Sequence, residues 1–358
     1  MTAPAPIPST GSPAESPAGL RLEALQRWFD DHVPECSGPL RVRLIQGGKS
    51  NLTYALDDGP HRWVLRRPPL GTLTPSAHDM AREYRVVAAV YGTGVPVARP
   101  VALCEDPSII GAPFGVVEYV DGTVVRGAED ASLLSPADRR RCALALVDQL
   151  AAIHQVDHRA VGLAEFGRPD GYLARQLKRW RGQWDLVTTR ETPLVNQLFT
   201  ALGDGLPPAG AGRSGIVHGD YRLDNTILDR ADPGVVRAVV DWEMATLGDP
   251  LADLGILLVY WDPISEPVLG VRHILLGNPG FPGAAELAGH YAARTGADLS
   301  HLPFYRALGY FKLAVITEGI HARHLAGQTV GDGFHTVGDA VLPLLREGLA
   351  TLTGQDAP

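Results

Sequence analysis

The strongest signal in the sequence is the stretch His218-Gly-Asp-Tyr-Arg-Leu-Asp-Asn225, followed by Asp241-Trp-Glu243. Asp220 and Asn225 are five residues apart, and the residues between Asn225 and Asp241 predict a β-hairpin with strands over 226–229 and 235–240. A hairpin returns the chain to the point where it began, so Asp241 is expected close to Asn225 in space. Two carboxylates and one amide would then converge on a single point.

These three residue types at this spacing suit phosphoryl transfer. Asp220 would be the catalytic base that accepts the proton of an attacking hydroxyl, while Asn225 and Asp241 would hold Mg²⁺ against the phosphates of ATP. The spacing His-x-Asp-x-x-x-x-Asn matches the catalytic loop of kinases. The alternative is that all three are ordinary turn residues flanking strands, which three matches in the right order disfavour.

Outward from this centre, the patterns predict an α+β, bilobal, protein-kinase-like fold. An N-terminal lobe would hold an antiparallel sheet and one helix, and a mainly helical C-terminal lobe would hold the catalytic hairpin. We expect a disordered tail over 1–19, a nucleotide-binding lobe over 20–120 and a catalytic and acceptor-binding lobe over 121–358, with a linker at 118–122. The expected strands are 41–45, 52–56, 62–66, 100–104 and 114–120; the expected helices are 22–29, one capped by Ser76 and Asp79, 136–156, 171–187, one from Pro250 and one after Phe304.

The segment Gln46-Gly-Gly-Lys-Ser-Asn51 lies between two expected strands. It is no Walker A loop, because Arg43 stands where that motif needs a glycine and a strand follows where it needs a helix. As a hairpin tip, Gly47 and Gly48 would let backbone N–H groups approach the phosphates, and Ser50 would add a hydroxyl. A plain tight turn is the alternative.

Other residues before position 121 are candidates for nucleotide binding. Arg66, on the third expected strand, would reach the α- and β-phosphates, and Val64 on the same face would pack on adenine. Glu83, on the apolar face of its helix, needs a partner, for which Arg66 is the natural choice. The backbone from Glu118 to Val120 would meet the adenine edge. The alternatives are a solvated arginine at a strand edge and a glutamate at the rim of an apolar face.

Together these motifs resemble the aminoglycoside-phosphotransferase-like small-molecule kinases of the APH/choline kinase type, and within them the subgroup of the kinase domain of acyl-CoA dehydrogenase family members 10 and 11. The resemblance covers about residues 40 to 345. It is carried by Val64-Leu-Arg-Arg-Pro-Pro69, Gly219 to Asn225, Asp241-Trp-Glu243 and Gly248-Asp-Pro-Leu-Ala-Asp-Leu-Gly255. It implies Asp220 as the base, Asn225 and Asp241 as metal ligands, ATP and Mg²⁺ as cofactors, and a small-molecule hydroxyl, such as that of a hydroxyacyl-CoA, as acceptor.

Two further residues are predicted to support the catalytic loop rather than to react. Asp253 lies one turn into an otherwise apolar helix, and a buried aspartate must be satisfied, so it should accept backbone N–H bonds from the loop. His218 is likewise expected to brace the loop. His154 and His158 have zinc-compatible spacing but no third ligand, and solvated positions at a helix end are expected.

The composition limits the kinds of binding partner and the cellular compartment that are expected for this protein. A net charge of −8 disfavours general binding to nucleic acid or anionic membranes. Three widely separated cysteines show neither metal-ligand nor disulfide spacing, so a reduced, cytoplasmic setting is expected. No apolar stretch is long enough to span a bilayer.

The helix expected over 171–187 carries a basic stripe in this acidic chain: Arg175, Lys178 and Arg179. Placed at the acceptor side, Arg175 and Arg179 would meet an anionic substrate; the alternative is an ordinary amphipathic helix with its tryptophans in the core. Three other functions stay open. An aminoglycoside or macrolide phosphotransferase would share the motifs. A protein kinase would need more residues between Asp241 and Asp249, and a non-catalytic nucleotide-binding protein is favoured only by arginine at position 66.

Overall fold

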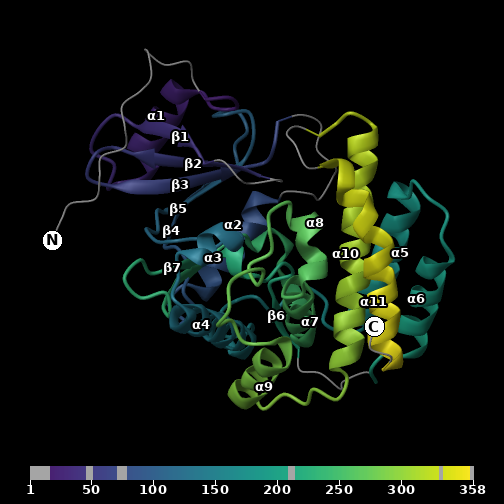
Figure 1. Ribbon diagram of the computed structural model, residues 1–358. Coiled ribbons are helices and arrows are strands. Elements are labelled where there is room, and N and C mark those ends of the chain that lie inside the picture. The colour runs from purple at the N-terminus through teal and green to yellow at the C-terminus, as the bar shows by residue number, and fades with distance from the viewer. Residues whose placement is uncertain (1–16, 46–50, 71–78, 209–213, 330–333, 355–358) are drawn as a thin grey trace. The chain divides into compact units, whose positions relative to one another are not determined.

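The computed structural model describes residues 17–45, 51–70, 79–208, 214–329 and 334–354 (Figure 1). The chain packs as two compact units. The first comprises Met1–Arg85 and Arg99–Tyr119, and the second comprises Val86–Ala98 and Val120–Pro358. The segment 86–98 belongs to the second unit, where Val239 N–H donates to Pro96 O at 2.8 Å. The expected tail over 1–19 falls almost wholly outside the described residues.

The first unit is built on a five-stranded antiparallel sheet in the order β1-β2-β3-β5-β4. Its strands are β1 (Arg41–Leu44), β2 (Leu52–Asp57), β3 (Arg62–Arg67), β4 (Pro100–Cys104) and β5 (Phe114–Glu118). Strand β3 alternates in burial: Trp63 and Leu65 lie in a core with Phe29 of helix α1 (Leu22–His32), while Val64 and Arg66 lie on the half-exposed face. The meander expected from the sequence is confirmed.

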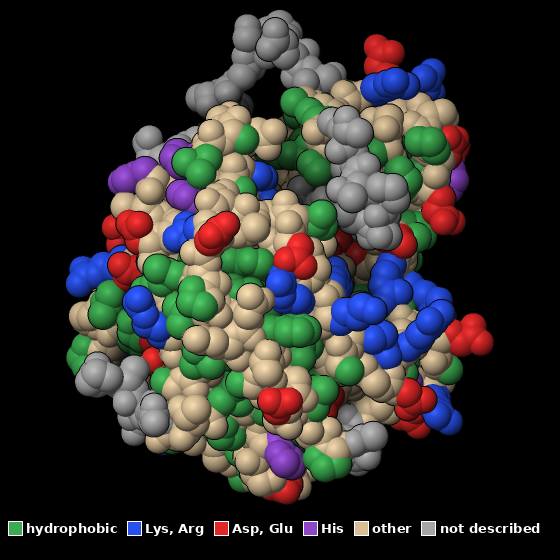
Figure 2. All heavy atoms as spheres, turned by 90° about the vertical axis from the view of Figure 1, so that its right-hand side faces the viewer, with side chains coloured by type: hydrophobic (Ala, Val, Ile, Leu, Met, Phe, Trp, Pro, Cys, Tyr) green, Lys and Arg blue, Asp and Glu red, His purple; other side chains and the backbone are tan. Residues whose placement is uncertain are grey.

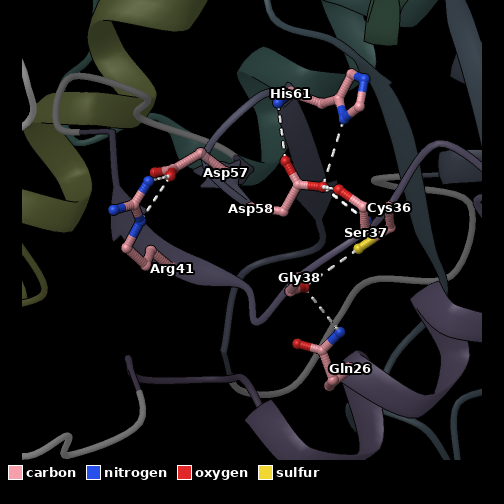
Figure 3. Close-up of polar contacts among 8 residues, drawn as sticks. All are labelled: Gln26, Cys36, Ser37, Gly38, Arg41, Asp57, Asp58 and His61. Atoms are coloured by element: carbon pink, nitrogen blue, oxygen red, sulfur yellow. Dashed lines mark hydrogen bonds and ion pairs between the residues drawn. The ribbon is translucent and has the colours of Figure 1, made fainter.

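A polar cluster ties the loop after α1 to the turn between β2 and β3 (Figure 3). The Asp58 carboxylate accepts hydrogen bonds from the N–H groups of Ser37 and His61, each at 2.8 Å. These bonds lower the pKa of Asp58, although burial would raise it. Next to it, Arg41 Nε donates to Asp57 at 2.6 Å, across the β1–β2 pair. The cluster therefore fixes one end of the hairpin that carries β3.

Helix α2 (Met80–Val90) follows strand β3 in the chain. Asp79 caps it, because its carboxylate accepts the Arg82 N–H at 2.9 Å. Ser76, the other expected cap residue, lies outside the described residues.

The second unit is mainly helical and contains two small two-stranded sheets, β6–β9 and β7–β8. Its strands are β6 (Gly215–Val217), β7 (Thr226–Leu228), β8 (Val236–Val239) and β9 (Thr246–Gly248). Its helices are α3 (Ala128–Ser132), α4 (Pro136–Gln155), α5 (Tyr172–Val187), α6 (Pro193–Asp204), α7 (Leu251–Tyr260), α8 (Glu266–Leu269), α9 (Ala284–Thr295), α10 (Leu302–Leu325) and α11 (Val341–Thr353).

Helix α10 runs through the core of this unit, beside α7, α11 and α5 (Figure 1). Gly255 of α7 allows the close approach of the two helices, because a Cβ there would lie 2.5 Å from Tyr305 O. The sequence had not indicated α6, α9 or β9, each of which is short and gains its stability from packing. Within the described residues, no helix is both long and apolar enough to cross a membrane.

Candidate active site

The loop that carries the expected base leaves strand β6 at His218 and turns sharply at Gly219. Gly219 has φ +87°, and a Cβ at this position would lie 2.7 Å from Met244 O. Both the left-handed backbone and the close approach therefore require glycine. This turn directs the next residue, Asp220, whose side chain is 21% exposed, toward the surface of the unit.

Asp253 of α7 anchors the backbone of this loop, and its side chain is fully buried. It accepts the backbone N–H of His218 at 2.6 Å and that of Gly219 at 2.8 Å. Burial would raise the pKa of Asp253, but the contact with His154 at 3.2 Å and these N–H donors outweigh it and lower the pKa. The carboxylate thus stays charged and fixes the loop backbone.

His154 is not in a solvated turn, so that expectation was wrong. Its ring is buried at the end of α4, with Nδ1 2.7 Å from the Tyr291 hydroxyl and Nε2 facing Asp253. The ring lies on the same face of α4 as the buried Leu150 and Ala151, which the helical spacing could have indicated. His154 therefore completes the support of Asp253 and does not bind zinc with His158.

His218 is also fully buried, with its Nε2 3.0 Å from Val240 O. Its Nδ1 accepts the Asp220 N–H at 3.3 Å, and its ring lies 4.8 Å from that of Trp242. Burial lowers the pKa of His218, so the ring is neutral near pH 7. A neutral ring that is engaged at both nitrogens has the geometry of a brace rather than that of a base.

The hairpin returns Asp241 to Asn225, as its strand pattern predicted. Strands β7 and β8 pair with Thr226 opposite Val239, and Val240 N–H donates to Asn225 O at 2.9 Å. Asp241 follows at φ 66°, the only described non-glycine residue with a positive φ. Such a strained backbone is held in place only by its surroundings and is common at functional sites.

Asn225 connects this turn to the expected base. Its amide nitrogen donates to the Asp220 carbonyl at 2.8 Å and to Asp220 Oδ2 at 3.2 Å. The nitrogen is therefore engaged with Asp220, and the amide oxygen is the atom that could serve a metal. A hard amide oxygen and the adjacent Asp241 carboxylate form a donor set that fits Mg²⁺.

Positive charge surrounds the Asp220 carboxylate. Arg222 Nε lies 3.4 Å from Asp220 Oδ2 and 3.2 Å from Asp224 Oδ1. Burial would raise the pKa of Asp220, but Arg222 and then Lys312 outweigh it and lower the pKa. The Tyr260 hydroxyl lowers the pKa of Asp220 further. Asp220 is therefore ionised at neutral pH, which is the form that a proton acceptor needs.

Sequence reasoning missed Arg222, Tyr260 and Lys312. Arg222 stands inside the quoted motif, and Tyr260 ends the apolar helix α7 with its ring 5.1 Å from the Arg222 guanidinium. Lys312 is the only charge in the apolar run from Ala307 to Ile316 of α10. That isolated charge was the one signal in the sequence that could have indicated it.

The first unit places Arg66 and Glu83 together, as expected. Arg66 Nε lies 3.0 Å from Glu83 Oε1, and both side chains are largely buried. Val64 shares the Arg66 face of β3. Gly47, Gly48 and Ser50 lie outside the described residues, so their predicted phosphate contacts stay predictions.

The Glu118–Val120 segment is partly engaged within its own sheet. Glu118 N–H donates to Arg99 O at 2.9 Å, and Tyr119 N–H donates to Arg62 O at 3.0 Å. The Glu118 carboxylate also pairs with Arg99 at 2.9 Å. A backbone N–H contact from this segment to adenine would therefore have to come from Val120.

The basic stripe of α5 is exposed at Arg175, Lys178 and Arg179, while Trp180 and Trp184 are buried in the core. On the face turned to the viewer, Figure 2 shows Lys and Arg side chains gathered in one patch. Arg175 also donates to the carbonyls of Arg168 and Asp170, which fixes the loop before α5. Arg179 is close enough to Lys312 for their charges to repel.

A test of the brace follows from the burial of Asp253. We expect Asp253→Ala to lower the free energy of unfolding by about 3–5 kcal/mol, because it leaves the N–H groups of His218 and Gly219 buried without an acceptor. Urea unfolding followed by circular dichroism measures this. Asp157→Ala, at an exposed turn, is the control and should change the stability by less than about 1 kcal/mol. Equal losses in the two variants would contradict the brace.

Comparison with solved structures identifies the class of fold. A Ralstonia eutropha protein assigned as an aminoglycoside phosphotransferase superposes with a TM-score of 0.80 at 35% identity, covering 93% of this chain and 98% of that one. A microcompartment-associated aminopropanol kinase superposes with a TM-score of 0.61 at 19% identity, covering 93% and 98%. The second likeness concerns the fold alone. The fold is that of the kinase-like phosphotransferases.

Sequence comparison specifies the family within that class. Residues 41–288 match the phosphotransferase enzyme family, APH, and the chain belongs to this family. Chicken (Gallus gallus) acyl-CoA dehydrogenase family member 11 is 38% identical over 323 residues, which are 87% of this chain and 40% of that protein. Mouse (Mus musculus) member 10 is 36% identical over 328 residues, 90% of this chain and 30% of that protein. The chain thus spans less than half the length of these curated relatives.

Proposed function

We propose that this protein transfers the γ-phosphoryl group of ATP, with Mg²⁺, to a hydroxyl group of a small molecule. One observation carries the proposal: on a braced loop, Asn225 Nδ2 is 3.2 Å from Asp220 Oδ2 and 2.8 Å from its carbonyl, and the β7–β8 hairpin returns the chain to Asn225 just before Asp241. Three polar groups held in this way would serve little purpose in a plain turn. The family to which the chain belongs supports the same reaction class.

Each group has a distinct role in this proposal. Asp220 orients the acceptor hydroxyl and takes its proton as the hydroxyl oxygen attacks phosphorus. Asn225 and Asp241 would hold Mg²⁺, which neutralises phosphate charge. Arg66, oriented by Glu83, would bind phosphate oxygens, and Val64 would contact the adenine. Catalysis would then come mainly from positioning and from charge neutralisation.

We further propose that the acceptor is an anion, with a hydroxyacyl-CoA thioester as the candidate. The exposed Arg175 and Arg179 of α5 support an anionic acceptor. A cavity in the second unit reaches Arg222 and offers both charge and apolar surface. Its lining includes the arginines Arg126 and Arg222, the carboxylate of Asp224, and the apolar Leu257, Leu269 and Ile274. A polycationic aminoglycoside would be repelled by these arginines.

A panel of acceptors tests this proposal. ATP consumption is measured with Mg²⁺ and hydroxyacyl-CoA thioesters, aminoglycosides or macrolides, and the phosphorylated product is identified by mass spectrometry. We expect product from the anionic thioesters. An aminoglycoside as the efficient substrate would overturn the proposed charge of the acceptor but not the phosphotransfer.

The basic stripe has its own test. Replacing Arg175 and Arg179 together with glutamine should raise the acceptor KM and weaken its dependence on salt, while the KM for ATP stays the same. Arg181→Gln, on the same helix but paired with Asp185 and Asn196, is the matched control and should behave like the wild type. A double variant with an unchanged acceptor KM would show that the stripe is only surface.

Arg66→Ala tests the nucleotide side. A charge-assisted hydrogen bond contributes about 1.5–3 kcal/mol, so the KM for ATP should rise about 10- to 100-fold. Arg41→Ala serves as the control, because Arg41 is likewise paired with a carboxylate, that of Asp57, but is largely exposed on the edge strand β1. If both variants bind ATP equally well, Arg66 does not contact phosphate.

A further inference from the structure

Lys312 is a buried cation in helix α10 of the second unit. Its residue is only 9% exposed, and its neighbours Phe311 and Leu313 are fully buried. Lysine is rarely buried unless it is paired, because moving an ammonium group out of water is unfavourable. Burial accordingly lowers the pKa of Lys312. An explanation is needed for a charge at this position.

The contacts of Lys312 point to the catalytic loop. Its ammonium donates a hydrogen bond to the Gly219 carbonyl, and it lies 5.5 Å from the centre of the Trp180 ring. Among the described residues it forms no ion pair with a carboxylate, although Asp220 and Asp253 attract it from a greater distance. The stabilisation of a buried ammonium by one carbonyl and one ring is incomplete.

The Gly219 carbonyl belongs to the peptide group that joins Gly219 to Asp220. The N–H of that peptide group donates to His218 Nδ1 at 3.3 Å, so Lys312 and His218 hold its two ends. The orientation of this peptide sets the direction in which the Asp220 side chain leaves the backbone. Asp253 holds only the preceding N–H groups, those of His218 and Gly219. Without Lys312, the peptide of the base itself would lack an anchor on its carbonyl side.

We propose that Lys312 is a positioning residue for phosphoryl transfer, which fixes the Gly219–Asp220 peptide and thereby aims Asp220 at the acceptor hydroxyl. The inference rests on the proposed function, since it assumes that Asp220 is the base. It also explains the burial: the charge is retained for geometry at the site and not for the stability of the fold. A methionine of similar shape should therefore preserve the fold and impair the reaction.

The test combines activity with stability. Mg²⁺-dependent ATP hydrolysis without acceptor is the activity measured, because water can replace the hydroxyl. Lys312→Met should lower kcat about a hundredfold, the loss expected when a reacting group moves by roughly 1 Å, with little change in the KM for ATP. Its melting temperature should equal or exceed that of the wild type. Lys312→Arg, which keeps a charged donor, should retain more activity than Lys312→Met.

Glu318→Met is the matched control on the same helix. Glu318 is fully buried and accepts from Thr189 N–H at 2.6 Å and pairs with Arg190 at 2.9 Å, away from the catalytic loop. It should lower the melting temperature and leave kcat close to the wild-type value. The two variants thus separate a charge that serves the reaction from a charge that serves the fold.

Chemical rescue provides the second readout. In Lys312→Ala, ethylammonium should enter the space left by the side chain and restore part of kcat in a saturable manner, whereas tetramethylammonium, which has no N–H, should not. If Lys312→Met keeps kcat while Asp220→Asn loses it, the positioning role is wrong and the proposed function stands. The positioning role is also wrong if kcat and stability fall together and neither arginine nor ethylammonium restores activity. If Asp220→Asn hydrolyses ATP like the wild type, the proposed function itself fails.

Discussion

Replacing Asp220 with asparagine is expected to lower turnover at least about a hundredfold, the scale of losing a general base. Asparagine has nearly the same shape, and its oxygen can still accept hydrogen bonds, but it cannot take the proton of the acceptor hydroxyl. The positive charges of Arg222 and Lys312 that lower the pKa of Asp220 would also lose their counter-charge. Initial rates at saturating ATP and acceptor measure the effect.

Nucleotide affinity separates loss of the base from loss of the site. Asp220→Asn should bind Mg-ATP as the wild type does, since Asn225, Asp241 and Arg66 are unchanged. Isothermal titration with a non-hydrolysable ATP analogue provides this control. Near-normal turnover of the variant would remove Asp220 from its assigned role, whatever the affinity.

The second large effect is expected at Asp241. Asp241→Asn should abolish Mg²⁺-dependent ATP binding, because a neutral amide is a far weaker ligand for a hard cation than a carboxylate. The strained backbone at φ 66° favours asparagine almost as well as aspartate, so the fold should survive the change. Titration of ATP with and without Mg²⁺ measures the loss.

A variant of a second aspartate of the hairpin controls for the change in net charge in this experiment. Asp232 lies in the turn at the other end of the β7–β8 hairpin and pairs with Arg141. Asp232→Asn changes the charge of the protein by the same amount and should leave Mg-ATP affinity unaltered. Equal affinities for wild type and Asp241→Asn would mean that Asp241 does not bind the metal.

The catalytic loop could be anticipated because its information is local in the sequence. The spacing of Asp220 and Asn225 and the hairpin that returns to Asp241 depend on residues within one short segment. The β1–β3 meander was likewise predicted from alternation and turn residues, and the Arg66–Glu83 pair followed from one charge on an apolar helix face. Such features need no knowledge of distant parts of the chain.

Two supports of the loop, His154 and Lys312, come from far away in the sequence and were missed for that reason, whereas Asp253 and His218 were predicted from the sequence. His154 reaches Asp253 across 99 positions, and Lys312 reaches Gly219 across 93. Local patterns cannot tell a helix-end histidine in water from one buried against another helix. Helices α6 and α9 were missed as well, although α6 begins at a local signal, the Thr192 cap followed by Pro193.

Transfer of the ³²P label from γ-³²P-ATP to a small molecule tests the proposed phosphotransfer most directly. Wild-type protein, Asp220→Asn and Asp232→Asn are incubated with Mg²⁺ and each member of the acceptor panel, and the labelled small molecules are separated by chromatography. We expect a labelled acceptor with wild type and with Asp232→Asn, and at least about a hundredfold slower labelling with Asp220→Asn. Labelling at the same rate in all three proteins, or transfer of label only to protein side chains, would contradict it.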